Sequence, residues 1–161
     1  MSSVYVILHN IRSVHNVASI FRTADAAGVA HVYLTGYTPA PVDRFGRIRR
    51  DFAKVSLDAE HYVPWEKRKN IRTLIRELKQ QGVHVIALEQ DARAVSYTKV
   101  KMKTPAALIV GNETNGISTA ILKQCDVIAE IPMRGKKESL NVSVAAGIAL
   151  FHFAHKDRPL A

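Results

Sequence analysis

Short apolar runs alternate with segments of helical periodicity along the chain. The run at residues 4–8, Val-Tyr-Val-Ile-Leu, has the length of a buried strand. Apolar residues then recur at helical spacing from Val17 to Ala24, and Gly28 ends that element. The same alternation predicts strands at 29–35, 83–88, 106–110 and 127–131, and helices at 65–81, 118–125 and 140–155. The stretch at 92–102 fits neither pattern.

Strands that alternate with helices predict an α/β domain with a mainly parallel sheet. The length of 161 residues suits one domain with a sizeable core, and no internal repeat or linker interrupts it. We therefore expect a single domain over residues 1–161. In such sheets, ligands bind in the loops that follow the carboxyl ends of the strands. The loops after the runs at 4–8, 106–110 and 127–131 are polar and become the candidate sites.

Charge and composition narrow the classes of partner. The chain carries 23 Lys and Arg against 14 Asp and Glu, a net charge of +9, which favours a polyanion such as nucleic acid. A basic small enzyme without such a partner is the alternative. The single cysteine, Cys125, excludes an intrachain disulfide and fits a cytoplasmic protein. The seven histidines show no metal-ligand spacing, and no apolar run approaches the ~18 residues of a membrane span. We expect no metal, no membrane and no signal peptide.

The first polar cluster begins at residues 10–13, Asn-Ile-Arg-Ser, and continues into the first helix. Asn16 and Arg22 follow at the start and middle of that helix, and Arg22 stands between two core positions. A guanidinium held there could clamp a phosphate or carboxylate through two hydrogen bonds. The alternative is an i,i+3 ion pair between Arg22 and Asp25.

The second polar cluster, residues 111–116, directly follows the strand at 106–110. Its two glycines, Gly111 and Gly116, let the backbone approach a ligand closely. The spacing is neither a P-loop nor the dinucleotide fingerprint. The carboxylate of Glu113 suits an ammonium, a hydroxyl or an arginine better than a bare phosphate. The alternative is a plain strand-to-helix turn, with Glu113 near the dipole of the coming helix.

The third cluster, residues 131–147, crosses a basic loop between the last strand and the last helix. Met133 and Leu140 offer apolar contacts, while the backbone near Ile131 and Ser139 could hydrogen-bond a flat base. The alternative is a core helix that Ser139 merely caps.

A basic stripe occupies residues 43–54 and has phenylalanines among its cations. It is the best candidate for contacting the phosphates of a nucleic acid, with residues 67–72 next. A solvated basic helix face is the alternative. The basic residues of the stripe are Arg44, Arg47, Arg49, Arg50 and Lys54, with Phe45 and Phe52 interleaved.

Taken together, the three clusters resemble the SpoU (TrmH-like) family of SPOUT-class RNA 2′-O-ribose methyltransferases. The likeness lies in their order and spacing and spans nearly the whole chain. The matching residues are Asn16-x5-Arg22-Thr23-Ala24, Gly111-Asn112-Glu113-x2-Gly116, and Ile131-Pro132-Met133-x-Gly135 followed by Ser139-Leu140-Asn141-Val142-Ser143.

This resemblance implies a Rossmann-like α/β domain with a deep C-terminal trefoil knot. It also implies a homodimer in which the first helix packs against the last. The methyl donor would be S-adenosylmethionine, with no metal. The donor would be held by Leu88, Gly111, Asn112, Glu113, Ile131, Met133, Ser139 and Leu140.

The reaction that the resemblance implies is attack of a ribose 2′-hydroxyl on the sulfonium methyl, where positioning supplies much of the rate. Arg22 would reach the donor site of the other subunit, hold the adjacent phosphate and orient the hydroxyl. A free guanidinium, with a pKa above ~12, is a poor base. Asn16, Glu113, Ser139 and Asn141 would align the loops, the substrate and Arg22.

RNA is the expected substrate, with tRNA favoured and rRNA possible, because no segment of the chain is left for an added RNA-binding domain. The alternatives are a non-catalytic RNA-binding module of the same fold, methylation of a base, and an NAD enzyme. The last is disfavoured because no glycine fingerprint follows the first strand. The residues expected to contact RNA are Arg12, Arg22, Arg44, Arg47, Arg49, Arg50 and Lys54.

Overall fold

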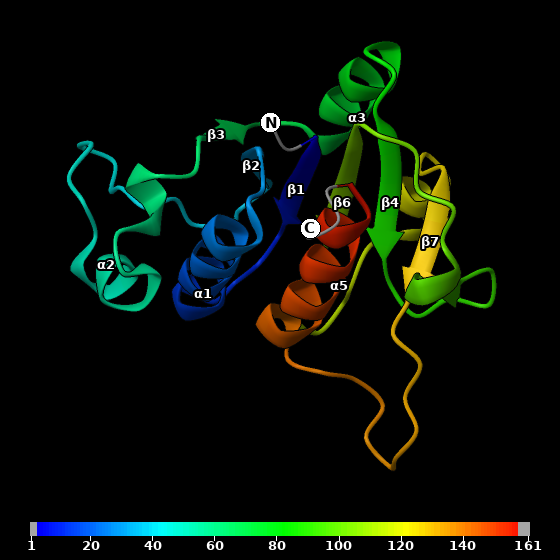
Figure 1. Cartoon of the computed structure of the whole chain (residues 1–161). Coiled ribbons are helices and arrows are strands. Elements are labelled where there is room, and N and C mark those ends of the chain that lie inside the picture. Colours follow the sequence, from blue (N-terminus) through cyan, green and yellow to red (C-terminus); the bar gives the residue numbers. More distant parts are fainter. Residues whose placement is uncertain (1–2, 158–161) are drawn as a thin grey trace.

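The structure is a computed structural model that describes residues 3–157. Strands and helices alternate along the chain (Figure 1), which confirms the predicted α/β class. The elements are β1 (Val4–His9), α1 (Val14–Ala27), β2 (His31–Thr35), α2 (Arg50–Ser56), the 3-10 turn η1 (Ala59–His61), β3 (Trp65–Arg68), α3 (Ile71–Gln80), β4 (His84–Leu88), β5 (Val95–Ser96), the 3-10 turn η2 (Tyr97–Lys99), β6 (Ala106–Val110), α4 (Thr119–Leu122), β7 (Val127–Glu130) and α5 (Val142–Asp157).

Within the described residues, seven strands form one sheet in the order β3-β2-β1-β6-β4-β7-β5, and every neighbouring pair is parallel. The register pairs Leu8 with Val110, Val110 with Leu88, and Leu88 with Ala129. The carboxyl ends of β1, β6, β4 and β7 therefore lie level with one another. This register brings the three polar clusters to one edge of the sheet, as the parallel arrangement requires.

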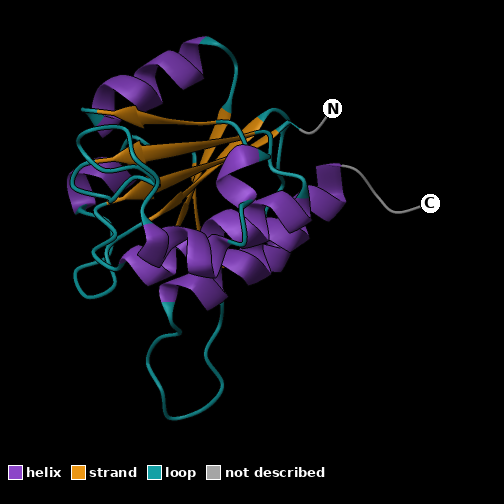
Figure 2. Ribbon diagram, turned by 90° about the vertical axis from the view of Figure 1, so that its left-hand side faces the viewer, coloured by secondary structure: helices purple, strands orange, loops and turns teal. Residues whose placement is uncertain are grey.

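Helices cover both faces of the sheet (Figure 2), and the central strands β1, β4 and β6 are mostly buried, whereas the edge strands β3 and β5 are partly exposed. On one face α1, α2 and α5 pack around a core that contains Phe21, Phe52 and Phe153. On the other face α3 and α4 pack against alternate residues of the same strands. Strand β6 shows the alternation, because Leu108 contacts the first core and Ile109 the second. Among residues 3–157, no helix is long and apolar enough to cross a membrane.

The predicted helix at 65–81 is wrong over its first residues. Trp65–Arg68 is strand β3, which pairs with β2 from Val32 onward. Helix α3 begins only at Ile71, because the side chain of Asn70 accepts hydrogen bonds from two backbone N–H groups of its first turn. The ambiguous stretch at 92–102 contains the short strand β5 and the turn η2. The trefoil knot stays a prediction.

The last helix begins at Val142 rather than at residue 140. The Asn141 side chain accepts a hydrogen bond from the backbone N–H of Ser143 at 2.8 Å, and the Asn141 carbonyl accepts from Ala145 N. Asn141 therefore caps α5, and Ser139 stands exposed two residues earlier. The interpretation of Ser139 as a simple helix cap is wrong.

Candidate functional site

A pocket of 330 Å³ opens where the carboxyl ends of β4, β6 and β7 meet the start of α5. In Figure 1, the long loop between β7 and α5 hangs below this edge of the sheet. The pocket gathers residues that are far apart in the sequence. It brings together all eight residues proposed to hold a donor: Leu88, Gly111, Asn112, Glu113, Ile131, Met133, Ser139 and Leu140.

Glu89 is a pocket residue that the sequence reasoning missed. Its Oε2 accepts the backbone N–H of Ile117 at 2.8 Å, and its Oε1 accepts that of Gln90 at 2.9 Å. It thus fixes the loop after β6 from the end of β4. Gly116 has φ +63°, a backbone conformation that favours glycine, and a Cβ built there would lie 2.1 Å from Glu89 Oε2, so a larger residue would displace the Glu89 carboxylate. The carboxyl-end rule that singled out the other loops would have found Glu89, because it directly follows β4.

Asn112 organises the loop after β6. Its buried side-chain oxygen accepts the backbone N–H groups of Thr114 and Asn115. Its side-chain nitrogen donates to the carbonyl of Asn10 and to the hydroxyl of Tyr37, both at 2.9 Å. One amide therefore joins the loops after β6, β1 and β2. Such a fully bonded buried amide holds its surroundings in one arrangement.

Glu113 is bound at the start of α1 and not at the helix that follows it. Its carboxylate accepts the backbone N–H of Arg12 at 3.0 Å, that of Ser13 at 3.1 Å and the side-chain amide of Asn16 at 3.1 Å. Desolvation alone would raise the pKa of Glu113, but the hydrogen bonds from Arg12 and Ser13 outweigh it and lower that pKa. The ionised carboxylate ties the second polar cluster to the first.

A further hydrogen bond brings in the third cluster. The Asn141 side chain donates to Asn16 Oδ1 at 3.3 Å, while its own oxygen accepts from the backbone N–H and hydroxyl of Ser143. Glu113, Asn16 and Asn141 therefore form one chain of hydrogen bonds beside the pocket. Three of the five residues proposed as catalytic belong to it, and Ser139 lines the pocket.

Arg22 lies apart from the pocket within one chain. Its side chain is exposed on α1. No acceptor between residues 3 and 157, Asp25 included, bonds to its guanidinium, so the alternative of an i,i+3 pair is not formed. Helix α1 packs against α5 in the same chain, and Gly147 of α5 faces Thr23, with a built Cβ 3.5 Å from Thr23 Cγ2.

The basic stripe is more heterogeneous than its sequence suggested. Phe52 is fully buried, with its ring centroid 5.2 Å from that of Phe21, so the expectation that it interleaves the surface cations is wrong. Its helical position on α2 points it into the core. Arg49 pairs with Asp51 at 3.1 Å, whereas Arg50 and Lys54 are exposed on α2 and Arg44 on the preceding loop. Arg12 is also exposed.

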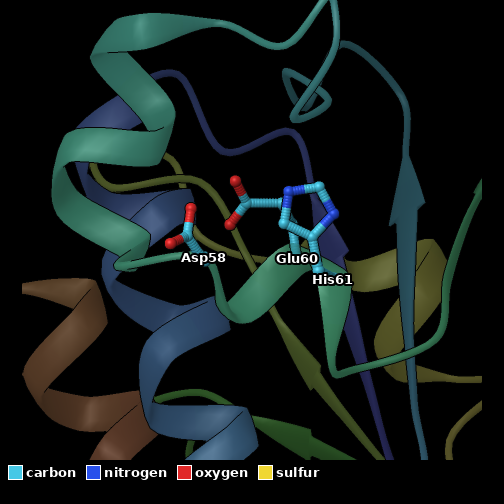
Figure 3. A group of neighbouring side chains, drawn as sticks. All are labelled: Asp58, Glu60 and His61. Atoms are coloured by element: carbon cyan, nitrogen blue, oxygen red, sulfur yellow. The ribbon is translucent and has the colours of Figure 1, made fainter.

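A separate acidic group lies after α2, where Asp58, Glu60 and His61 come together (Figure 3). Their ligand-type atoms lie within 4.8 Å of one another. Glu60 is buried and accepts a hydrogen bond from the Ser56 hydroxyl, while the other two side chains are exposed. Sequence spacing had not singled out this group. Nothing beyond its composition points to a cation there, and the expected absence of a metal stays a prediction.

Comparison with known proteins shows which family this chain belongs to. The model of the SpoU rRNA Methylase family matches residues 3–151. The chain belongs to the SpoU rRNA methylase family. This SpoU chain is 39% identical, over 91% of its length, to the 23S rRNA (guanosine-2′-O-)-methyltransferase RlmB of Ralstonia nicotianae. It covers 56% of that relative, and 60% and 63% of two further curated relatives.

Two solved structures have the same fold as this chain. An AdoMet-bound rRNA methyltransferase from Sinorhizobium meliloti superposes with a TM-score of 0.86 and 30% identity, over 98% of this chain and 57% of that one. The TrmH/SpoU tRNA modifying enzyme from A. aeolicus gives 0.84 and 31%, over 98% of this chain and 76% of that one. The fold of this SpoU chain is therefore shared by one protein named for rRNA and another named for tRNA.

Proposed function

We propose that this chain transfers the methyl group of S-adenosylmethionine to a ribose 2′-hydroxyl of RNA. The observation that carries the proposal is the pocket at the ends of β4, β6 and β7, which is lined by all eight residues that the family resemblance assigns to the donor. Membership of the SpoU family supports the reaction class, and the named relatives include rRNA and tRNA enzymes.

The pocket lining fits a methyl donor that carries a flat base. Leu88, Ile131 and Leu140 supply apolar walls, beside backbone groups at the carboxyl ends of three strands. A volume of 330 Å³ lies at the lower end of small-molecule sites. When bound, the donor supplies an activated sulfonium methyl. The protein then has to hold the donor and place the ribose hydroxyl in line with that methyl.

Arg22 needs a second copy of the chain to act at this pocket. Helix α5 leaves an apolar stripe exposed, with Val144 50%, Ile148 37% and Phe151 51% accessible. These residues share one side of the helix by their spacing. A homodimer built on α1 and α5 covers this stripe and brings the partner's Arg22 to the pocket. Exposed apolar surface of this kind marks an interaction site.

Within that dimer, Arg22 binds the phosphate next to the target ribose and orients its 2′-hydroxyl. The hydrogen-bonded chain of Glu113, Asn16 and Asn141 keeps the loops around the donor in place. Ser139 at the pocket rim contacts the substrate or the donor. We propose tRNA as the first substrate to examine and rRNA as the second.

The test combines donor binding with methyl transfer. Calorimetric titration with S-adenosylmethionine should give one site per chain. Incubation of the protein with labelled donor and total tRNA or rRNA should then place label in a 2′-O-methylnucleoside. A protein that binds RNA but shows no heat with the donor is the non-catalytic module of the same fold, and the proposal fails.

A further inference from the structure

Phe45 is a large apolar side chain held out in solvent. Its accessible fraction is 66%, in contrast to its neighbour along the stripe, Phe52, which is fully buried. An exposed phenylalanine at this level of accessibility contributes little to folding. It lies on the loop that joins β2 to α2 and is not among the residues that line the pocket.

The loop that carries Phe45 is tightly bonded. Val42 and Ile48 form an antiparallel bridge at its base, and the backbone N–H of Asp43 donates to the carbonyl of Arg47. The Asp43 carboxylate also accepts the backbone N–H groups of Phe45 at 2.8 Å and of Arg47 at 3.0 Å. Gly46 takes φ +77°, which closes the turn. Phe45 is thus presented by a preformed turn.

Two guanidinium groups lie over the exposed ring. The central carbon of Arg44 lies 4.7 Å from the Phe45 ring centroid, and that of Arg47 lies 5.0 Å from it. Asp43 bonds Arg47 Nε at 2.8 Å and so fixes one of them. The other, Arg44, has no carboxylate partner among the described residues. An aromatic ring beside guanidinium planes is a surface on which a nucleobase stacks while a cation meets the adjoining phosphate.

We propose that Phe45, flanked by Arg44 and Arg47, stacks an unpaired nucleobase of the RNA substrate. The inference rests on the proposed RNA substrate and narrows its class: the bound RNA presents a single-stranded nucleotide, as in a loop or bulge, to this turn. Paired bases are stacked within a helix and leave no face for Phe45, so a continuous duplex gains only phosphate contacts. Electrostatic attraction alone would need the arginines but not the exposed ring.

Binding of defined RNA probes tests the inference. The probes are an RNA hairpin with an unpaired loop and a fully paired duplex of the same length. Removing one base–aromatic stack costs about 1–3 kcal/mol, so Phe45→Ala should weaken hairpin binding about 5- to 150-fold. Phe45→Leu should lose most of the same affinity, because it is apolar but cannot stack, and Phe45→Trp should restore it. Duplex binding should change little.

Tyr62, which is 70% exposed on another loop, provides the matched control through Tyr62→Ala. That variant should bind the hairpin like the parent chain. Photocrosslinking of a hairpin with 5-iodouridine in its loop should place the adduct on Phe45. The inference is overturned if Phe45→Ala and Tyr62→Ala behave alike, or if Phe45→Ala weakens duplex and hairpin equally.

Methyl transfer separates this inference from the proposed function. If the parent chain methylates RNA while Phe45→Ala binds the hairpin unchanged, only the stacking inference fails. If the parent chain neither methylates RNA nor binds the donor, the proposed function fails. In that case hairpin binding that depends on Phe45 still supports the stacking contact.

Discussion

The pocket and the basic stripe differ in how their residues are held. Around the pocket, Glu113, Asn16 and Asn141 are joined by hydrogen bonds between segments that lie 97 and 125 residues apart in sequence. On the stripe, Arg49 pairs with its neighbour Asp51, and Arg50 and Lys54 are exposed. The pocket therefore depends on particular partners, and a single change there affects several loops. The stripe depends on summed charge, and one change there removes one contact.

Arg22→Ala should have the largest effect. In the proposed dimer, Arg22 orients the ribose hydroxyl, and misplacing a reacting group costs on the order of 100-fold in rate. We expect methyl transfer to fall at least that much, while calorimetry shows unchanged affinity for S-adenosylmethionine. Arg76→Ala, an exposed cation on α3, is the control and should keep its turnover. Near-parental turnover of Arg22→Ala would rule out the assigned role.

Gly116→Ala should disrupt the pocket from the loop side. It adds a Cβ 2.1 Å from Glu89 Oε2 at a residue with φ +63°, so strain and clash combine. We expect a loss of about 2–4 kcal/mol in the free energy of unfolding and weaker donor binding. Gly82→Ala is the matched control, since its φ is +81° but no heavy atom lies within 4 Å of the built Cβ. Gly82→Ala should lower the free energy of unfolding by about 1 kcal/mol, because only the backbone strain at a positive φ contributes. Equal losses in urea denaturation would contradict the role of Glu89.

Glu113→Gln should remove the pH-dependent part of the stability that comes from the hydrogen bonds between the first two clusters. The pKa of Glu113 is lowered in the folded chain, so its contribution to stability is present above the unfolded value of about 4.3 and is lost as pH falls through the folded pKa. At neutral pH the variant should be less stable by on the order of 1 kcal/mol, given the partial exposure of the carboxylate. Urea unfolding of both proteins at neutral pH and in acid, below the folded pKa of Glu113, measures this effect. The difference in the free energy of unfolding between variant and parent chain should shrink in acid.

Single charge removals on the stripe should have the smallest effects. Arg50→Ala should weaken binding to all RNA sequences alike and lower the salt slope of the binding constant by about one. Arg49→Ala should do less, because Asp51 already neutralises part of the Arg49 charge. Titration of RNA binding against salt measures both slopes. If Arg49→Ala has the larger effect, the contrast between paired and free cations is wrong.

The sequence predicted the parallel α/β fold because its strands are continuous apolar runs, as in β6, whose five residues are all buried. It also predicted which loops meet, since the carboxyl ends of parallel strands share one edge. It failed at Trp65–Arg68, where a short edge strand carries no apolar pattern and only pairing with β2 defines it. The composition of a short segment does not predict its pairing with a strand that is distant in the sequence.

Within the site, the family resemblance named eight residues that line one pocket, but it did not predict how the residues around that pocket hydrogen-bond. Glu113 binds the start of α1, some 100 residues earlier, and no sequence periodicity predicts that contact. Phe52 was misplaced on the surface because its neighbours are basic, although its helical phase points it inward. Glu89 was overlooked because it belongs to none of the three motifs.

The most direct measurement is mass spectrometry of RNA nucleosides after incubation of tRNA and rRNA with the purified chain and labelled S-adenosylmethionine. We predict label in one 2′-O-methylnucleoside, from tRNA in the first instance, and its loss with Arg22→Ala. Label confined to a base, or no label in either RNA despite donor binding, would contradict ribose methylation by this pocket.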